Sequence, residues 1–182
     1  ERGLKTESRI GPKAYLKPGA AFAGGTLARD LNFLRDAGRP GSLFAAALES
    51  NRSHREWPRR ALAEALGGVR GKRVAVLGLA YKAGTSTLRR SEGLALCEWL
   101  NENGATAVPF DPDVRELPAG AGSPALSVES AAASADAIAI MNDAPRWKEI
   151  RLADLARRAP APAVVDPNGI LSGQPIPKGL AY

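Results

Sequence analysis

The sequence predicts an α/β fold in which a parallel sheet follows a helical segment. In the second half of the chain, short apolar runs alternate with helical patterns, an order typical of βαβ units and a parallel sheet. From Leu27 to Leu66, apolar residues instead recur at helical spacing. We therefore divide the chain into residues 1–68, a loop followed by helices, and residues 69–182, the domain with the sheet.

The helical part is expected to contain two or three helices. Residues 1–25 are rich in Gly, Pro and Lys and are predicted to be a loop or an extended entry segment. A helix is expected from Leu27, because leucines recur on one helical face. A Gly/Pro-rich break separates it from a second helix between Ser42 and Leu66. Pro58 either kinks that helix or begins a new one, since proline has no backbone N–H to donate.

The sheet domain is expected to hold four buried parallel strands, each a short apolar run bounded by Gly, Asp or Asn. These runs are residues 73–78, 106–110, 137–141 and 163–166. Helices are expected between them at 91–103, 127–134 and 147–159, the last with Leu152 and Leu155 facing inward. Residues 114–124 are predicted to be a loop and 169–182 an irregular tail.

Composition excludes several classes of protein. The chain has 182 residues, of which 45% are hydrophobic, enough for a packed core of Ala, Leu and Val. The net charge of +6 indicates either a solvated basic surface or an anionic ligand. The basic residues are scattered and do not alternate with aromatic residues, so we expect no nucleic-acid partner.

The rare residue types narrow the chemistry further. With Cys97 as the only cysteine and His54 as the only histidine, neither an intramolecular disulfide nor a Cys-rich metal site can form, and a zinc enzyme is not expected. No apolar run has the length of a membrane span and no signal peptide is visible, so we expect a soluble, cytoplasmic protein without membrane contact. The chain starts at Glu1 without an initiator Met, which is consistent with further residues upstream.

Residues 78–90 are the first candidate for a ligand-binding loop. They leave the carboxyl end of the first predicted strand, the edge at which ligands of open α/β sheets bind. Lys82 and Arg89 either face an anionic ligand there or are solvated cations of a surface loop; the glycines form neither a GxGxxG fingerprint nor a P-loop. Asp111 ends the second strand, where it either binds a ribose or serves as the turn residue before Pro112.

Residues 17–30 (KPGAAFAGGTLARD) are the second candidate. Their glycines let the backbone approach a ligand closely, and Gly24-Gly25 precedes a predicted helix whose N-terminus favours anions. Thr26 is a suitable N-cap for that helix. The segment is either a ligand-binding loop or a Gly-rich connector in which Thr26 only caps the helix.

Eight short motifs occur along the chain in an order and at spacings that match those of a known family. They are Arg9-Ile-Gly, Tyr15-Leu-Lys-Pro-Gly, the Phe22-Ala-Gly-Gly turn, Asp30, Asn51, GLAYKAGTSTLR (78–89), Asp111-Pro112 and VVDPNGIL (164–171). Over residues 9–182 they resemble the central and C-terminal parts of the UDP-glucose/GDP-mannose dehydrogenases, with YLKPGxAF and KAGT closer to the GDP-mannose branch. The resemblance implies a helical dimerisation domain and a Rossmann-like domain that binds the nucleotide sugar. Members of the family oxidise the sugar's primary alcohol to an acid with two NAD molecules.

The resemblance also implies roles for individual residues. Arg9 would reach the sugar across a homodimer formed by the central helices, and Asp30 would help to activate water. Arg89 and Thr26 would contact NAD, with Thr26 at the catalytic position. The substrate-binding residues would be Lys17, Pro18, Gly19, Ala20, Ala21, Phe22, Ala23, Tyr81, Lys82 and Asn168.

The chain departs from the family at the reaction centre. The family's nucleophile is the Cys of a GGSC turn, and the aligned residue here is Thr26. A thiol ionises in part near neutrality and can hold the aldehyde as a thiohemiacetal and then a thioester, whereas a Thr hydroxyl does not ionise there. Cys97 lies on an apolar helical stripe and is expected in the core. Other family residues are replaced by Ala23 (Gly), Arg29 (Lys), Thr87 (Asp) and Asn168 (Arg).

Two functions are therefore open. The first is the C-terminal part of a nucleotide-sugar 6-dehydrogenase that binds a GDP-mannose or UDP-glucose type of substrate and NAD, with an impaired reaction centre. The alternative is a non-catalytic nucleotide-sugar-binding or oligomerisation module of the same fold. The family's N-terminal NAD-binding domain has no counterpart within these 182 residues.

Overall fold

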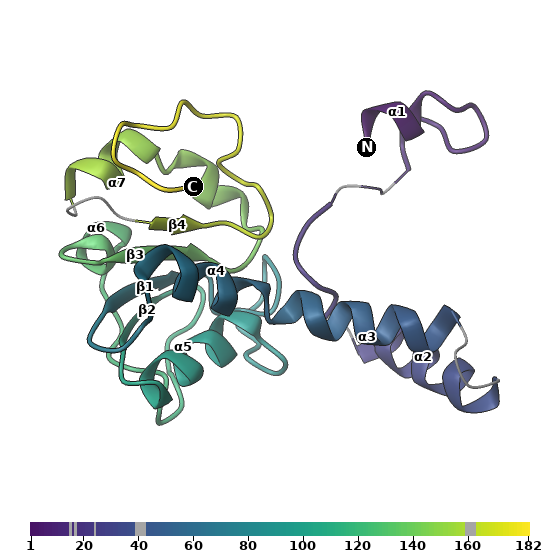
Figure 1. The fold of residues 1–182 in the computed structure, drawn as a ribbon, viewed down its shortest axis with the longest axis horizontal. Helices are drawn as coiled ribbons and strands as arrows, with labels where there is room; N and C mark the ends of the chain where they lie inside the picture. The colour runs from purple at the N-terminus through teal and green to yellow at the C-terminus, as the bar shows by residue number, and fades with distance from the viewer. Residues whose placement is uncertain (15, 17, 24, 39–42, 159–162) are drawn as a thin grey trace.

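The chain folds into a sheet domain from which a helical arm extends to one side (Figure 1). The computed structural model describes all residues except 15, 17, 24, 39–42 and 159–162. None of the helices in the described part of the chain is both long and apolar enough to cross a membrane.

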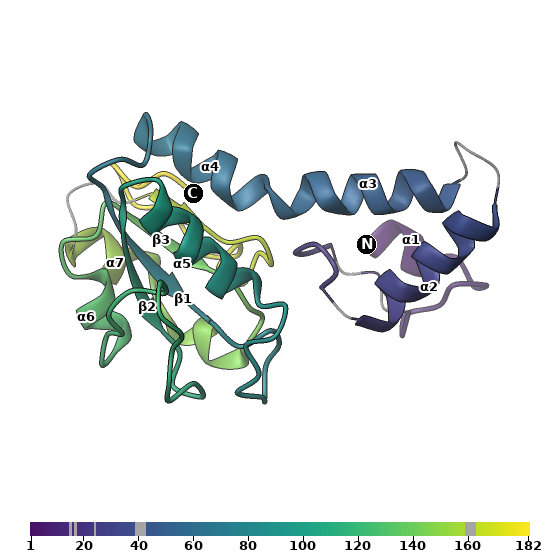
Figure 2. The ribbon, with the colours of Figure 1, turned by 90° about the horizontal axis from the view of Figure 1, so that it is seen from below.

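Four helices precede the sheet in the described part of the chain. These are α1 (Arg2–Lys5), α2 (Gly25–Ala37), α3 (Leu43–Arg55) and α4 (Trp57–Leu66). Of these, α2 and α3 form the arm, whereas α4 packs on the sheet domain. Figure 2 shows α3 continuing into α4 along nearly the same direction, with α2 lying beside α3. Pro58 begins a new helix rather than kinking one, because its missing N–H costs nothing in a first turn. The expectation of an entry segment without helix was wrong in one place, since α1 lies within it.

The sheet has the four predicted strands, all parallel. They are β1 (Arg73–Leu77), β2 (Thr106–Phe110), β3 (Ala137–Ile140) and β4 (Ala163–Val165), in the order β2-β1-β3-β4. The α/β class and the parallel sheet are thus confirmed, and the limits of β2 are those predicted. The division between the two parts at residue 68 stays a prediction.

The helices between the strands are α5 (Glu92–Glu102), α6 (Val128–Ala132), the 3₁₀ helix η1 (Pro145–Glu149) and α7 (Leu152–Arg158). The single helix predicted over 147–159 was wrong, because η1 and α7 are separate. Gln174 from the tail separates them: its amide accepts from Leu152 N at 2.9 Å and donates to Ile150 O at 2.7 Å. Leu152 and Leu155 are buried as predicted.

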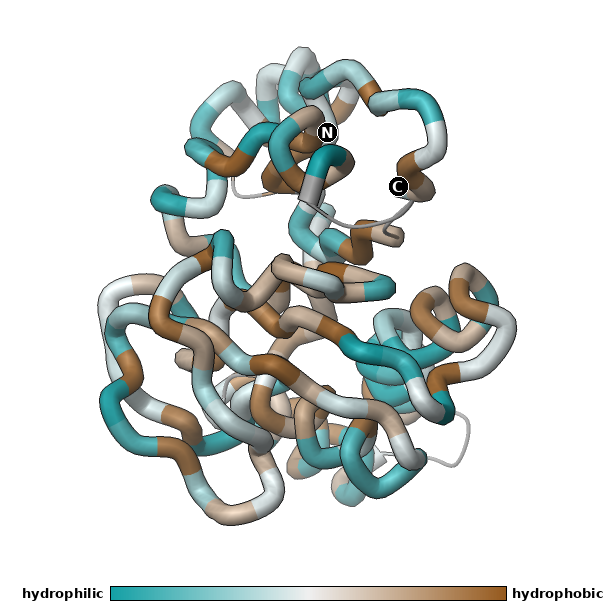
Figure 3. Tube along the Cα trace, turned by 90° about the vertical axis from the view of Figure 1, so that its left-hand side faces the viewer, coloured by the Kyte–Doolittle hydropathy of each residue, from teal (hydrophilic) through white to brown (hydrophobic). Residues whose placement is uncertain are grey.

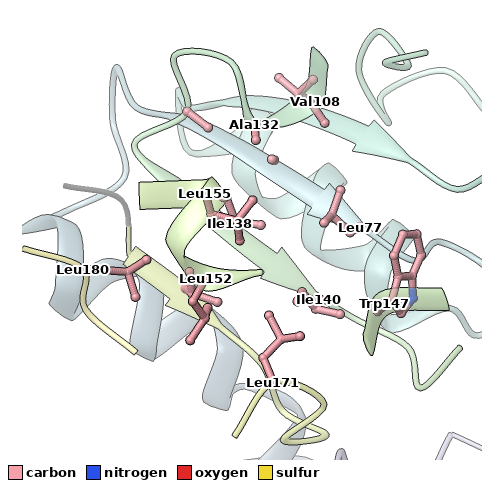
Figure 4. Close-up of a cluster of buried hydrophobic side chains, with 14 of the residues drawn as sticks. Leu77, Val108, Ala132, Ile138, Ile140, Trp147, Leu152, Leu155, Leu171 and Leu180 are labelled. Carbon is pink, nitrogen blue, oxygen red and sulfur yellow. The ribbon is translucent and has the colours of Figure 1, made fainter. Parts of the chain in front are cut away.

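Alternate residues of β1 face opposite layers of the domain. Val74 and Val76 pack toward α4 and α5, whereas Ala75 and Leu77 pack toward α6, η1 and α7. Figure 4 shows the second layer, in which the indole of Trp147 closes one end of the cluster. Apolar residues occur in the strands and in the helices that cover them (Figure 3). Burying a side chain of this size contributes about 1.5–3 kcal/mol, so the two layers fix the sheet on which the candidate site is built.

Candidate functional site

A cleft of about 340 Å³ opens where the carboxyl ends of β1, β3 and β4 meet the loop 18–23. It is lined by Pro18, Gly19, Ala20, Ala21, Phe22, Ala23, Ala80, Tyr81, Lys82, Glu92, Met141, Asp143 and Asn168. The strands β2 and β3 lie on opposite sides of β1, so the strand order reverses at β1. The carboxyl edge at such a reversal is the usual position for a ligand of an open α/β sheet. The structure therefore brings together all the predicted substrate residues except Arg9 and Lys17; Lys17 lies outside the described residues.

The loop after β1 is held by a buried carboxylate. Asp111 Oδ2 accepts hydrogen bonds from Leu79 N at 2.8 Å and Ala80 N at 2.9 Å, and Oδ1 accepts from Asp113 N at 3.0 Å. Hydrogen bonds to an ionised acceptor are stronger than neutral ones. Of the two readings of Asp111, the structure supports the turn residue, because both oxygens are taken by backbone N–H groups and the side chain is buried.

Two further buried polar residues complete this support, and their contacts with this loop were not predicted from the sequence. Asn142 donates to Ala80 O at 3.1 Å, and its Oδ1 accepts from Trp147 Nε1 at 2.6 Å. Ser91 donates to Leu79 O and also caps α5, where its Oγ accepts from Leu94 N at 3.0 Å. The capping role of Ser91 was predicted. The only signal for Asn142 was its place directly after an apolar strand.

Two glycines let these groups approach one another. Gly78 has φ +87°, and a Cβ added there would lie 2.7 Å from the side chain of Asn142. A Cβ on Gly93 would overlap the carbonyl oxygen of Gly78, so this glycine lets α5 pack against the loop. The two glycines therefore leave room for Asp111, Asn142 and Ser91 to hold the backbone that leads to Tyr81 and Lys82.

The opposite wall, the loop 18–23, is held by both parts of the chain. From α3, Asn51 bonds Phe22 N at 2.9 Å and Phe22 O at 3.0 Å, and His54 Nε2 lies 3.0 Å from Gly19 O. From the loop after β4, Asn168 Oδ1 accepts from Ala20 N at 3.1 Å. Asn168 thus connects the loop to the sheet domain. The family resemblance, in which Asn168 replaces an Arg, did not suggest this contact.

The cleft carries one cation without a carboxylate partner among the described residues. The Lys82 ammonium lies 5.4 Å from the ring centroid of Tyr81. Glu92 lines the same cleft, but it is neutralised by Arg55, whose Nε lies 2.7 Å away in an ion pair rather than an aligned hydrogen bond. Burial raises the pKa of Glu92, and the charge of Arg55 offsets this only in part. Asp143 adds an exposed carboxylate at the rim.

A smaller hollow of about 210 Å³ adjoins the cleft. It is lined by Ala23, Gly25, Tyr81, Thr87, Arg89 and Arg90, so the two hollows share Ala23 and Tyr81. The helix α2 begins at Gly25, so the prediction of Thr26 as N-cap was wrong and Thr26 lies in the first helical turn. From this turn, Gly25 lines the smaller hollow, whereas Thr26 lines neither of the two hollows.

Besides Thr26, two predicted residues of the described chain lie outside both hollows. Asp30 is exposed and forms an ion pair with Arg29 at 3.1 Å. Arg9 is exposed and pairs with Glu7 at 2.9 Å. Within one chain, neither Arg9 nor Asp30 lines the cleft. The roles that the family resemblance implies for them therefore require a second copy of the chain or another domain.

Two other features do not belong to the candidate site. A larger hollow of about 470 Å³ lies between α4 and β4, and no predicted site residue lines it. Its walls are mainly apolar, with Trp57, Ala163 and Val165 among them. Cys97 is fully buried in the core as predicted, and burial raises the pKa of its thiol to about 12. It therefore cannot replace the missing nucleophile.

Comparison with known proteins identifies the family. Residues 75–173 match the UDP-binding domain of the UDP-glucose/GDP-mannose dehydrogenase family. The chain belongs to this family. The matched domain supplies most of one wall of the cleft, including Ala80, Tyr81, Lys82 and Asn168.

Relatives extend the match beyond this domain. UDP-glucose 6-dehydrogenase TuaD of Bacillus subtilis is 31% identical over 178 residues, which cover 93% of this chain and 38% of TuaD. UDP-glucose 6-dehydrogenase of Rhizobium meliloti is 33% identical over 166 residues, covering 86% of this chain and 37% of that protein. The structure of the UDP-D-ManNAc dehydrogenase from Pyrococcus horikoshii superposes with a TM-score of 0.78 at 27% identity, over 98% of this chain and 41% of that one.

The chain thus spans about two fifths of the length of these relatives. The family and the Rossmann-like fold are confirmed. The preference for the GDP-mannose branch stays a prediction.

Proposed function

We propose that this chain binds a nucleotide sugar of the UDP-glucose or GDP-mannose type in the cleft at the carboxyl edge of the sheet. The observation that supports this most is the cleft itself, in which the loop 18–23, Lys82 and Asn168 converge from three places in the sequence. Its volume of about 340 Å³ lies within the usual range of about 300–1,000 Å³ for small-molecule sites.

Among the charged groups of the cleft, which include the exposed Asp143, Lys82 suits a diphosphate. Lys82 has no carboxylate partner within the described residues, and the carboxylate of Glu92 is already paired with Arg55. An ammonium that meets a phosphate forms a charge-assisted hydrogen bond, which is stronger than a neutral one. Asp111 and Asn142 already fix the backbone before Lys82. Binding therefore costs little further conformational entropy in this loop.

For the whole protein we propose NAD as cofactor, with Arg89 and the first turn of α2 beside it. NAD, when bound, accepts a hydride from the sugar's primary alcohol. A single reversible transfer needs positioning and a base and no covalent bond to the protein. The second oxidation, through a thioester, is not expected, because the Thr26 hydroxyl does not ionise near neutrality and Cys97 is buried.

A non-catalytic binding or oligomerisation module remains the second candidate. Besides Thr26, the contact of Asn168 favours it: where the family has an Arg for substrate, this side chain holds Ala20 of the facing loop. The Asn168 side chain is therefore engaged by the protein's own backbone within the cleft. Such a module would bind the nucleotide sugar without turning it over.

We further propose that the arm forms a homodimer. Neither α2 nor α3 contributes a buried residue within one chain, although both carry large apolar side chains. Leu27, Phe33 and Leu43 are 49%, 71% and 80% exposed. Burial of such a surface against a second copy is the simplest way to cover it, and Arg9 would then approach the partner's cleft. A cytoplasmic location stays a prediction.

Calorimetry with the substitution Lys82→Ala tests the binding proposal. Loss of a charged partner is expected to weaken UDP-glucose or GDP-mannose binding by about 1–3 kcal/mol, roughly 5- to 150-fold. Lys178→Ala is the matched control, because Lys178 is exposed and lines none of the hollows described above. If the unaltered chain binds no nucleotide sugar, the proposed site is wrong. If it converts the sugar to the acid with NAD while Thr26 is intact, the argument about the missing thiol fails.

A further inference from the structure

Arg90 occupies an unusual position beside the first turn of α2. Its guanidinium packs directly on Gly25, so closely that a Cβ added to Gly25 would overlap Nη1. Its backbone has φ +62°, a left-handed conformation that is uncommon outside glycine. A non-glycine residue held in this region indicates that the surrounding structure, and not local preference, sets its place.

The hollow next to Arg90 has an excess of positive charge. Arg89 and Arg90 both line it, and no carboxylate is among its lining residues. Neither guanidinium forms an ion pair in the part of the chain that the structure describes, whereas Arg29 and Arg55 each pair with a carboxylate. Its volume of about 210 Å³ is below the range of about 300–1,000 Å³ for whole ligands, so it fits one anionic group of a larger molecule.

That larger molecule is a ligand of the adjoining cleft. The two hollows meet at Ala23 and Tyr81, so a ligand in the cleft can extend one end past Tyr81 toward Arg90. If the nucleotide sugar binds as proposed, this end is the sugar carbon that the family oxidises, because Gly25, the residue directly before Thr26, lines the hollow. An acid at that carbon presents a carboxylate, which the planar fork of a guanidinium binds with two parallel hydrogen bonds.

We propose that Arg90 binds the carboxylate of a nucleotide sugar acid, so that this chain favours the uronate over the neutral sugar. The inference rests on the proposed nucleotide-sugar site and adds the chemical form of the ligand. Lys82 faces the diphosphate, and Arg90 faces the acid at the other end. Arg89 remains available to NAD.

Calorimetric titration of the intact chain with matched pairs of ligands tests this directly. The pairs are UDP-glucose with UDP-glucuronate and GDP-mannose with GDP-mannuronate. We expect the acid of the preferred pair to bind roughly tenfold more tightly than the neutral sugar. Arg90→Gln should remove this preference and leave the affinity for the neutral sugar within roughly twofold. Arg115→Gln, at an exposed arginine that lines none of these hollows, should keep the preference.

Gly25→Ala provides a second, independent test. The added methyl must displace the Arg90 guanidinium while leaving its charge intact. Alanine is a better helix former than glycine, and thermal melts should show no loss of folding. The preference for the acid should fall with this substitution as it does with Arg90→Gln.

Each other outcome has a definite meaning. Equal affinity for acid and neutral sugar overturns the inference and leaves the nucleotide-sugar site intact, whereas binding of neither overturns both. A preference that survives Arg90→Gln also overturns it. A titration with NAD separates the remaining source of anionic oxygens: if Arg90→Gln weakens NAD binding and not the preference for the acid, Arg90 serves a dinucleotide phosphate and the inference is wrong.

Discussion

Replacing Asp111 with Ala should both destabilise the fold and weaken ligand binding. The substitution removes the acceptor for Leu79 N and Ala80 N, and both N–H groups lie in the buried turn after β1. A buried donor left without a partner costs about 1–3 kcal/mol, so two of them predict a loss of about 2–6 kcal/mol in the free energy of unfolding. Because this turn leads directly to Tyr81 and Lys82, the affinity for the nucleotide sugar should fall in parallel.

Urea denaturation and calorimetry measure the two effects separately. Asp113→Ala is the matched control: this carboxylate lies two residues further on and pairs with Arg146 at 2.7 Å on the surface, where such a pair contributes about 0.2–1 kcal/mol. Asp111→Asn should fall between the two, because the amide keeps one acceptor oxygen and loses the other. If Asp111→Ala unfolds at the same urea concentration as Asp113→Ala, the carboxylate does not organise the loop and the reasoning is refuted.

Three further predictions concern the core, the cleft and the arm. Cys97, with its pKa raised to about 12, should not react with iodoacetamide at pH 8 in the native chain and should react after unfolding; native reactivity would show that the helix opens. The pKa of Glu92 is raised above its ordinary value of 4.5, so the folded state binds this proton more tightly than the unfolded state does. Stability from this group is therefore present at low pH and is lost as pH rises through the raised pKa. Urea melts should show Glu92→Gln gaining stability relative to the unaltered chain between pH 4 and pH 8, and a constant difference would contradict this. If the arm forms the proposed homodimer, Phe33→Asp should convert it to a monomer in light scattering with the sheet domain still folded; an unchanged mass would remove α2 from the proposed interface.

The sequence was sufficient for the strands and for most of the residues around the cleft, but not for Ala80, Glu92, Met141 and Asp143. Apolar runs bounded by polar or Gly residues predicted all four strands, because both faces of a parallel sheet are buried and most strand positions are therefore apolar. The family resemblance implied that the loop 18–23 and Lys82 belong to one site, and the structure places them in one cleft.

The contacts that hold this site depend on residues far apart in the chain, which local patterns do not connect. Asp111 was ambiguous because its partners, Leu79 N and Ala80 N, are about thirty residues earlier in the sequence. Asn142 has no distinguishing motif, although it joins that turn to Trp147. Similarly, the break between η1 and α7 is set by Gln174, more than twenty residues later.

The arm shows a different limit. Leucines on one face of α2 predicted a helix correctly, but a helical period does not say what covers that face. Within one chain, Leu27 and Leu34 stay 49% and 39% exposed. The partner of an amphipathic face is a property of the assembly, and a second copy of the arm is the partner we propose.

Mapping the bound nucleotide sugar by ¹⁵N–¹H NMR tests the central claim most directly. Titration of UDP-glucose or GDP-mannose into the labelled chain should shift amide signals of residues 19–23, 80–82, 141, 143 and 168, which line the cleft. Signals of Ala61, Ala163 and Val165, in the larger apolar hollow, should stay unchanged. Shifts confined to that larger hollow, or no shifts with either ligand, would contradict the account.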